Sequence, residues 1–229
     1  MINLIIFDLD GTLLNTIADL AKSTNHALRA NGFPTHPVEA YRRFVGNGIA
    51  KLFERALPEG EKTEENIRRL REVFLPYYRE HDTEQSAPYP GISTLLRRLQ
   101  ERNVLVAVAS NKYHAATCKL VAHYFPEIRF AKVLGQREGI APKPNPAIVY
   151  EILAATAVDR RKALYAGDSN VDMQTALNSG VAACGVTWGF RPRAELEAFH
   201  PSYIADTAEE IADIALAQGR CGGLLPGNP

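Results

Sequence analysis

The stretch Phe7-Asp8-Leu9-Asp10-Gly11-Thr12, residues 7–12, follows a short and mostly apolar run over residues 2–7. The run is rich in β-branched residues, which predicts a buried strand of a parallel sheet. Asp8 and Asp10 come directly after it, and two like charges roughly 4 Å apart repel by about 4 kcal/mol at an effective dielectric of about 20. A hard divalent cation with oxygen ligands, Mg²⁺ first among them, would offset that repulsion. The alternative is an ordinary Asp-Gly turn after a strand.

Length and composition place the chain among globular proteins. Its 229 residues, of which 46% are hydrophobic and 23% charged, suffice for one large or two modest domains. The formal net charge is zero, so neither a nucleic acid nor a membrane is indicated as a partner. No basic segment precedes the first apolar run, and no stretch has the length of a membrane span. We therefore expect neither a signal peptide nor a membrane anchor.

The cysteines and histidines carry no metal or disulfide pattern. Cys118, Cys184 and Cys221 are odd in number and scattered, without a Cys-x-x-Cys pair. They are expected to be reduced thiols in a cytoplasmic protein. The six histidines lack the paired spacing of a zinc site.

Apart from the run before Asp8, strand patterns are found only after residue 88. Over residues 15–88 the apolar positions follow helical spacing and strand signals are nearly absent. Pro76 lies inside the longest of these helical patterns and is expected to kink or divide the helix. One face of that helix carries Ile67, Leu70, Phe74 and Tyr78.

Further along the chain, short buried strands alternate with helices, which is typical of a doubly wound parallel sheet. The expected strands cover residues 104–109, 130–134, 163–166, 181–186 and 203–205. We therefore predict an α/β domain over residues 1–14 and 89–229, with an all-helical domain over residues 15–88 inserted into it. The tail, about residues 219–229, is rich in Gly and Pro and is expected to be disordered.

Polar residues follow four of the expected strands, and ligands bind beyond the carboxyl ends of strands in such sheets. Each has an ordinary explanation alone. Ser110-Asn111 could cap a helix, Lys143 could be solvated, and Asp172 could complete the cap that begins at Ser169. Together, acids, a hydroxyl and a cation at one sheet edge predict a site. Its candidates are Asp8, Asp10, Ser110, Asn111, Lys143, Asp168 and Asp172.

With these residues in view, the chain resembles the haloacid dehalogenase superfamily. Four segments carry the resemblance, in order: Asp8-Leu9-Asp10-Gly11-Thr12, Ser110-Asn111, Lys143-Pro144 and Gly167-Asp168-Ser169-x-x-Asp172. The inserted helices match the helical cap of that family. Within it, the chain is most similar to the phosphoglycolate phosphatases, through Val45-Gly46-Asn47-Gly48 and Val186-Thr187-Trp188-Gly189-Phe190.

The resemblance implies a phosphatase mechanism. Asp8 stands where the family has its nucleophile, which forms an aspartyl-phosphate. Asp10 would protonate the leaving oxygen and later take a proton from water. Mg²⁺ would be held by a carboxylate oxygen of Asp8, the backbone carbonyl of Asp10 and a carboxylate oxygen of Asp168. Ser110 and the Asn111 amide would bind the phosphoryl oxygens.

Other residues would support this centre. Lys143 would supply positive charge beside the nucleophile and the phosphate. Asp172 would orient Lys143 or a metal-bound water, and Thr12 and Ser169 would lie around the same groups. Asn15 departs from the many relatives that have an acid there, which bears on the hinge or the substrate rather than on the reaction.

The cap would close over the site and exclude water. Asn47, Gly48 and Lys51 lie at an expected helix N-terminus, which suits an anionic group. Together with Arg191 they are the candidates for contacting a substrate carboxylate. The alternative is that this loop only joins two helices.

The leading prediction is a Mg²⁺-dependent phosphatase of small phosphate esters, with 2-phosphoglycolate favoured, acting as a monomer or homodimer. Asp10 together with Thr12 favours a phosphomonoesterase over relatives that lack that acid. A pyrophosphatase, a broad sugar-phosphate phosphatase and a hexose-phosphate mutase stay open as alternatives. Outside enzymes, a phospho-accepting receiver-like module shares such strand-end residues but needs neither Asp10 nor a cap. A dinucleotide-binding fold is disfavoured because no G-x-G-x-x-G follows the first strand.

Overall fold

A six-stranded parallel sheet forms the centre of the larger part of the molecule. The computed structural model describes residues 1–217. The strand order is β5-β4-β1-β6-β7-β8, so the first strand lies inside the sheet and is paired on both sides. The strands are β1 (Leu4–Phe7), β4 (Leu105–Tyr113), β5 (Phe130–Gln136), β6 (Ala163–Gly167), β7 (Ala182–Val186) and β8 (Tyr203–Ala205).

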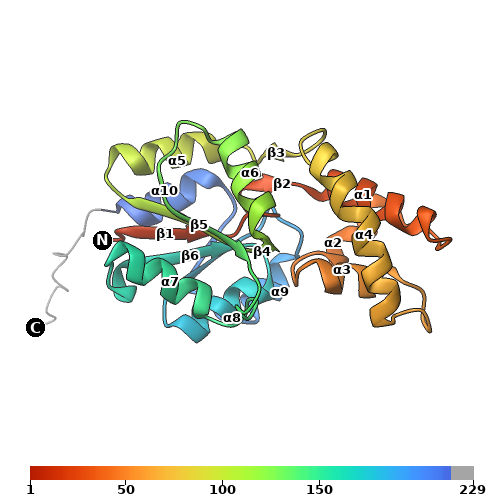
Figure 1. Cartoon of the computed structure of the whole chain (residues 1–229). Helices are drawn as coiled ribbons and strands as arrows, with labels where there is room; N and C mark the ends of the chain where they lie inside the picture. The colour runs from red at the N-terminus through yellow and green to blue at the C-terminus, as the bar shows by residue number, and fades with distance from the viewer. Residues whose placement is uncertain (218–229) are drawn as a thin grey trace, which may run out of the picture.

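Helices cover both faces of this sheet (Figure 1). Successive side chains of a strand point to opposite faces. Accordingly, Ile5 and Phe7 pack with helices α5, α6 and α10, whereas Leu4 and Ile6 pack with α7 and α8. Both faces of β1 are therefore buried, as expected from its continuous apolar run. The helices here are α5 (Ile92–Glu101), α6 (His114–Tyr124), α7 (Ala147–Thr156), η1 (Arg160–Lys162), α8 (Asn170–Ser179), α9 (Arg193–Glu197) and α10 (Ala208–Leu216).

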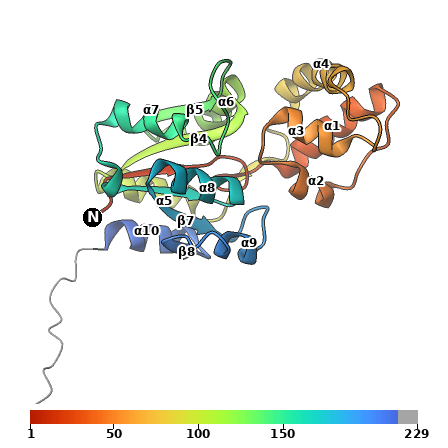
Figure 2. The same ribbon diagram turned by 90° about the horizontal axis from the view of Figure 1, so that it is seen from below.

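The chain leaves the sheet after β1 to build a separate group of helices, which stands beyond the carboxyl end of β1 in Figures 1 and 2. We call this group the cap; it has its own apolar core, to which Ala116 and Phe190 of the sheet part also contribute. The cap helices are α1 (Ile17–Ala30), α2 (Val38–Phe44), α3 (Ile49–Ala56) and α4 (Glu64–His81).

The two connections between the sheet part and the cap run side by side. They form a small antiparallel pair, β2 (Leu14–Asn15) with β3 (Ala87–Pro88). The predicted fold class, a doubly wound parallel sheet with an inserted helical cap, is confirmed. The domain boundaries at residues 14–15 and 88–89 stay predictions.

Two details differ from the sequence-based expectation. Helix α4 is not divided at Pro76 but runs through it from Glu64 to His81. Pro76 is exposed while Phe74 and Tyr78 are buried, so water can solvate the carbonyl that lacks its helical donor. Strand β4 is longer than expected and continues to Tyr113 after a shift of register against β5.

The expected disordered tail, from about residue 219, and Cys221 lie outside the described residues. Cys118 and Cys184 are free thiols. Within residues 1–217, none of the helices combines the length and the apolar character needed to cross a membrane.

Candidate active site

The polar residues at the strand ends meet at one crevice. Strand β1 lies between β4 and β6, and the chain builds the sheet outward from it in both directions. Such a switch point opens a crevice at the carboxyl ends of the central strands. Asp8 follows β1, Ser110 lies near the end of β4, and Asp168 follows β6. The cap faces this same edge of the sheet (Figure 1).

Asp8 is a buried carboxylate, and the hydrogen bonding of its Oδ1 is incomplete. Its backbone N–H donates to the carbonyl of Ala166, which fixes it at the end of the sheet. The Lys143 ammonium lies 3.0 Å from Asp8 Oδ1, yet that oxygen accepts no hydrogen bond of good geometry from residues 1–217. Burial raises the pKa of Asp8 to about 7, although Lys143 opposes the shift.

Lys143 is held by two further groups besides Asp8. Its ammonium donates to Asp172 Oδ1 at 2.7 Å and to the hydroxyl of Tyr165 at 3.0 Å. Burial lowers the pKa of Lys143, but the carboxylates of Asp172 and Asp8 outweigh burial and hold it well above its usual value. Lys143 is therefore a fixed positive charge beside Asp8.

Asp172 completes the N-terminal cap of α8 as well as holding Lys143. Its Oδ2 accepts from the Ser169 hydroxyl at 2.6 Å and from the Ser169 backbone N–H at 3.1 Å, in a capping box. Both carboxylate oxygens of Asp172 thus have protein donors. The helix-cap explanation of Asp172 is therefore correct, and its role in the site stays a prediction.

Asp168 sits in a cradle that only glycines allow. Its Oδ1 accepts from the Thr12 hydroxyl at 3.2 Å and its Oδ2 from the Phe190 backbone N–H at 2.7 Å. A Cβ atom at Gly11 would lie 2.3 Å from Asp168 Oδ2, and one at Gly189 would lie 2.2 Å from Asp168 Cβ. Burial, with the charges of Asp172 and Asp8, raises the pKa of Asp168 well above its usual value.

Asp10 lies on the cap side of Asp8. Its Oδ1 accepts from the Thr16 hydroxyl at 2.7 Å. The ammonium of Lys112 lies 3.1 Å from Oδ1 and 3.2 Å from Oδ2, and the Lys112 side chain is 4% exposed. Asp10 is therefore fixed by a hydroxyl at the start of the cap and by a cation from the end of β4.

The acids fit a hard divalent cation. Carboxylate oxygens of Asp8, Asp168 and Asp172 lie within 4.8 Å of one another. Three buried acids close together repel, and Asp8 Oδ1, which accepts no well-formed hydrogen bond from residues 1–217, is an oxygen ligand of the kind that Mg²⁺ prefers. Both oxygens of Asp168 and both of Asp172 already accept hydrogen bonds, but Asp172 is ion-paired with Lys143 at 2.7 Å, whereas the donors to Asp168 are neutral. Asp168 is therefore the better ligand of the two.

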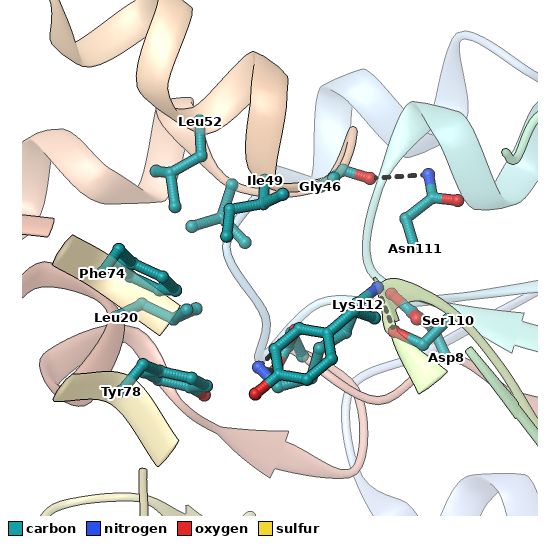
Figure 3. A pocket seen from close by; sticks show the side chains of 14 residues that line it. Asp8, Leu20, Gly46, Ile49, Leu52, Phe74, Tyr78, Ser110, Asn111 and Lys112 are labelled. Carbon is teal, nitrogen blue, oxygen red and sulfur yellow. Dashed lines mark hydrogen bonds and ion pairs between the residues drawn. The ribbon is translucent and has the colours of Figure 1, made fainter. Parts of the chain in front are cut away.

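A cavity of about 60 Å³ lies between the acids and the cap. Figure 3 shows Leu20, Ile49, Leu52, Phe74 and Tyr78 on the cap side, facing Asp8, Ser110 and Lys112 on the sheet side. One wall is thus apolar and the other is charged.

Asn111 ties the two sides together. Its side-chain amide donates to the carbonyls of Gly46 in the cap and Lys143, both at 3.1 Å, and its Oδ1 accepts from the Lys143 backbone N–H at 2.8 Å. Figure 3 shows the bond between Asn111 and Gly46. Asn111 therefore links the cap loop to the lysine beside Asp8.

The four residues predicted to contact a substrate carboxylate are not brought together. Gly48 lines the cavity, whereas Asn47 and Arg191 line a separate cleft with Arg42, Arg43 and Arg55. Lys51 is half exposed and pairs with Glu54. Arg191 instead fastens the cap loop, since its guanidinium donates to the carbonyl of Arg42 and, at 2.8 Å, to that of Val45.

Two residues of the cavity, Lys112 and Tyr78, were not predicted from the sequence. Lys112 stands two positions after Ser110, and residues two apart in an extended segment share a face. That spacing was the available signal. Tyr78 occupies an apolar helical stripe, in which nothing distinguishes it from a core residue.

Comparisons with known proteins agree with this geometry. The family model of haloacid dehalogenase-like hydrolases matches residues 5–186. A phosphoglycolate phosphatase of Mesorhizobium japonicum is 34% identical over 88% of this chain and 89% of its own length. One of Haemophilus influenzae is 32% identical over 92% of this chain and 97% of its own length.

Solved structures show the same fold. A crystal structure from Haemophilus somnus, described as that of a predicted phosphoglycolate phosphatase, has a TM-score of 0.86 and 30% identity, covering 93% of this chain and 97% of that one. That of CbbY from Rhodobacter sphaeroides, in complex with phosphate, has a TM-score of 0.73 at 22% identity and covers 92% and 96%.

The chain belongs to the haloacid dehalogenase-like hydrolases. Within that family it is a phosphoric monoester hydrolase.

Proposed function

We propose that this protein is a Mg²⁺-dependent phosphatase that hydrolyses 2-phosphoglycolate through an aspartyl-phosphate on Asp8. The observation that carries the proposal is the state of Asp8. It is a buried carboxylate that lines the cavity, and its Oδ1 lies 3.0 Å from the fixed Lys143 ammonium. Such an oxygen is suited to attack phosphorus or to bind a cation.

In the first step, a carboxylate oxygen of Asp8 attacks phosphorus and the ester oxygen leaves. Asp10 lines the same cavity and would donate a proton to that leaving oxygen. In the second step, water attacks the phosphoaspartate, and Asp10 would take a proton from it. The phosphoryl group passes to water and Asp8 is regenerated.

Three groups would hold the phosphoryl oxygens. Lys143 supplies a buried positive charge that the surrounding carboxylates keep protonated. The hydroxyl of Ser110 lines the cavity. The side-chain amide of Asn111 is already used by two carbonyls, so its contribution would come from the backbone N–H.

The metal site is part of the proposal. Asp8, Asp168 and the backbone carbonyl of Asp10 would hold Mg²⁺, with Asp172 orienting Lys143. When bound, the ion supplies positive charge that neutralises the phosphate and favours the ionised form of Asp8. Thr12 and the Phe190 N–H fix Asp168 for this role, and Ser169 fixes Asp172.

Two observations support a small substrate such as 2-phosphoglycolate. The relatives from M. japonicum and H. influenzae bear that activity in their names. The cavity is small, about 60 Å³, which suits a compact ester. A reducing, cytoplasmic setting also belongs to the proposal, and the free thiols of Cys118 and Cys184 are consistent with it.

The test is phosphate release from 2-phosphoglycolate, pyrophosphate, glucose 6-phosphate and an aryl phosphate, with Mg²⁺ and with EDTA. We expect 2-phosphoglycolate to be preferred, and release to vanish in EDTA and in Asp8→Asn. Metal-dependent release without that preference would overturn the substrate. Slow loss of a single phosphate, with no multiple turnover, would favour the receiver-like alternative.

A further inference from the structure

Tyr78 of helix α4 has a buried hydroxyl without a partner. The residue is 1% exposed, and its Oη makes no hydrogen bond with any group of residues 1–217. Buried polar groups are almost always satisfied, so an orphan donor beside a cavity needs an explanation. Figure 3 shows the ring extending from α4 toward the side of the cavity that holds Lys112. Burial also raises the pKa of Tyr78 well above its usual value, so it remains a donor.

Lys112 is the second unexplained group of this cavity. Its ammonium pairs with Asp10 and lies 4.7 Å from the centre of the Tyr78 ring. An ammonium has three N–H donors. Hydrogen bonds to the two oxygens of Asp10 take two of these donors, so Lys112 has one left for a ligand, although its side chain is almost fully buried.

The rest of the cap wall offers a ligand no polar side chain. Leu20, Ile49, Leu52 and Phe74 line it with apolar groups. A polar substituent on the far side of the phosphate ester would lose its water there. It would be tolerated only where Tyr78 and Lys112 can replace that water.

We propose that Tyr78 and Lys112 form a subsite for a carboxylate carried by the substrate on the carbon next to its ester oxygen. This inference rests on the proposed phosphatase function and names its specificity determinants. One ammonium donor and one hydroxyl donor match the two oxygens of a carboxylate. The small cavity places this subsite close to Asp8, so the linking carbon chain must be short.

This subsite replaces the four residues first expected to bind a carboxylate. Asn47 and Arg191 face a different cleft, Lys51 is engaged with Glu54, and Gly48 contributes no side chain. Because Tyr78 belongs to the cap and Lys112 to the sheet part, the subsite is complete only when the cap lies over the acids.

The experiment compares 2-phosphoglycolate with ethyl phosphate, which has the same carbon count but no carboxylate. The quantity measured is the ratio of their kcat/KM values. In wild-type protein the ratio should favour 2-phosphoglycolate. In Tyr78→Phe and in Lys112→Met it should fall about tenfold or more, the usual effect of losing one hydrogen bond to a charged group. If a substitution disturbed Asp10 as well, kcat/KM would change for both substrates alike, and this change would cancel in the ratio.

Matched controls separate the subsite from stability. Tyr41 is a buried cap tyrosine whose hydroxyl donates to Asn25 outside the cavity, and Lys119 pairs with the buried Asp82, also outside the cavity. Tyr41→Phe and Lys119→Met should keep the wild-type ratio. Lys112→Arg, which retains the cation, should recover most of the ratio that Lys112→Met loses. A ratio unchanged in Tyr78→Phe, or a wild-type ratio near one, would overturn the subsite.

A binding arm keeps this test independent of turnover. Calorimetry on Asp8→Asn with Mg²⁺ measures the affinity for the same two esters. We expect tighter binding of 2-phosphoglycolate, lost when Tyr78→Phe is added. If wild type hydrolysed neither ester but this difference held, the proposed function would fail and the subsite would stand. Equal affinities would remove the subsite whatever the activity.

Discussion

Gly11 and Gly60 both have φ near +91°, but their surroundings differ. A Cβ atom at Gly11 would meet Asp168 at 2.3 Å, whereas one at Gly60 would meet no atom of residues 1–217 within 4 Å. Both alanine variants should lose about 1–2 kcal/mol through backbone strain. Gly11→Ala should in addition weaken Mg²⁺ binding at least tenfold, because Asp168 must move. Thermal melting and Mg²⁺ titration of activity check this, and equal Mg²⁺ dependence in both variants would contradict it.

The pKa of Asp8 sets a pH dependence. Since burial raises it from 3.8 to about 7, the folded, metal-free protein keeps a proton that the unfolded chain releases above about pH 4. The cost of burying Asp8 therefore builds up as pH rises from about 4 to about 7, and stability falls over that window. Mg²⁺ needs the ionised form, so its stabilising effect should grow with pH.

Melting temperatures at pH 5, 6, 7 and 8, in EDTA and in Mg²⁺, test this expectation. Asp8→Asn should make the metal-free profile less steep, because Asp8 no longer titrates while Asp168, whose pKa is also raised by burial, remains. A Mg²⁺ effect that is larger at pH 5 than at pH 8 would contradict the assignment of Asp8 to the metal.

At the scale of single residues, the sequence predicts those site residues whose position follows from the strand order of the sheet alone. Asp8 and Asp168 had to meet because both follow strands of one parallel sheet. The partners that cross from cap to sheet could not be predicted. The contact of Tyr78 with Lys112 depends on how α4 lies over β4, which no local pattern encodes. For the same reason Arg191 was expected at the substrate, although it binds backbone carbonyls of the cap loop.

Among the elements, the loop between α2 and α3 is held to the sheet part by hydrogen bonds. Arg191 fastens it to the sheet part, and Arg42 returns the contact by donating to the carbonyl of Gly189 at 3.1 Å. Arg191→Gln should loosen this closure, raise KM and lower kcat by about tenfold together. The neighbouring Arg193 pairs with Glu197 and Asp206, away from the cap, so Arg193→Gln should leave both constants near wild type. Hydrogen exchange at residues 45–48 should rise only in the first variant.

Helix α4 carries a removable defect at Pro76. Proline inside a helix removes one hydrogen bond and costs about 3 kcal/mol or more in a helix interior. Here the site is exposed and solvent reduces that cost, so Pro76→Ala should stabilise the fold by about 1–2 kcal/mol. Urea unfolding measures it, with Arg71→Ala on the exposed side of the same helix as the reference. A destabilised Pro76→Ala would mean that the proline itself is needed for cap packing.

The elements themselves follow largely from periodicity. Buried strands such as β1 and β6 are continuous apolar runs, and the cap helices follow the spacing of their apolar residues. The end of β4 was missed because Ser110 to Tyr113 is polar and pairs with β5 only after a change of register. That helix α4 continues through Pro76 could not be predicted, because the exposure of Pro76 depends on tertiary packing.

In the whole molecule, helices pack on both faces of the sheet and position the strand ends, while the cap forms the opposite wall of the cavity. In the proposed function, the chemistry lies on the sheet side, and the choice of substrate lies where the cap meets it. Variation in the cap should therefore change which ester is used, whereas changes at Asp8, Asp168 or Lys143 should abolish hydrolysis of all esters.

The most direct measurement is to locate the transferred phosphoryl group. Protein is mixed with 2-phosphoglycolate and Mg²⁺, quenched in acid within the first turnover, digested and analysed by mass spectrometry. We predict an acid-stable, base-labile phosphoryl group on the peptide that contains Asp8, absent in EDTA and in Asp8→Asn. Rapid multiple turnover with no phosphorylated Asp8 in the quenched samples, or a phosphoryl group on another residue, would contradict the account.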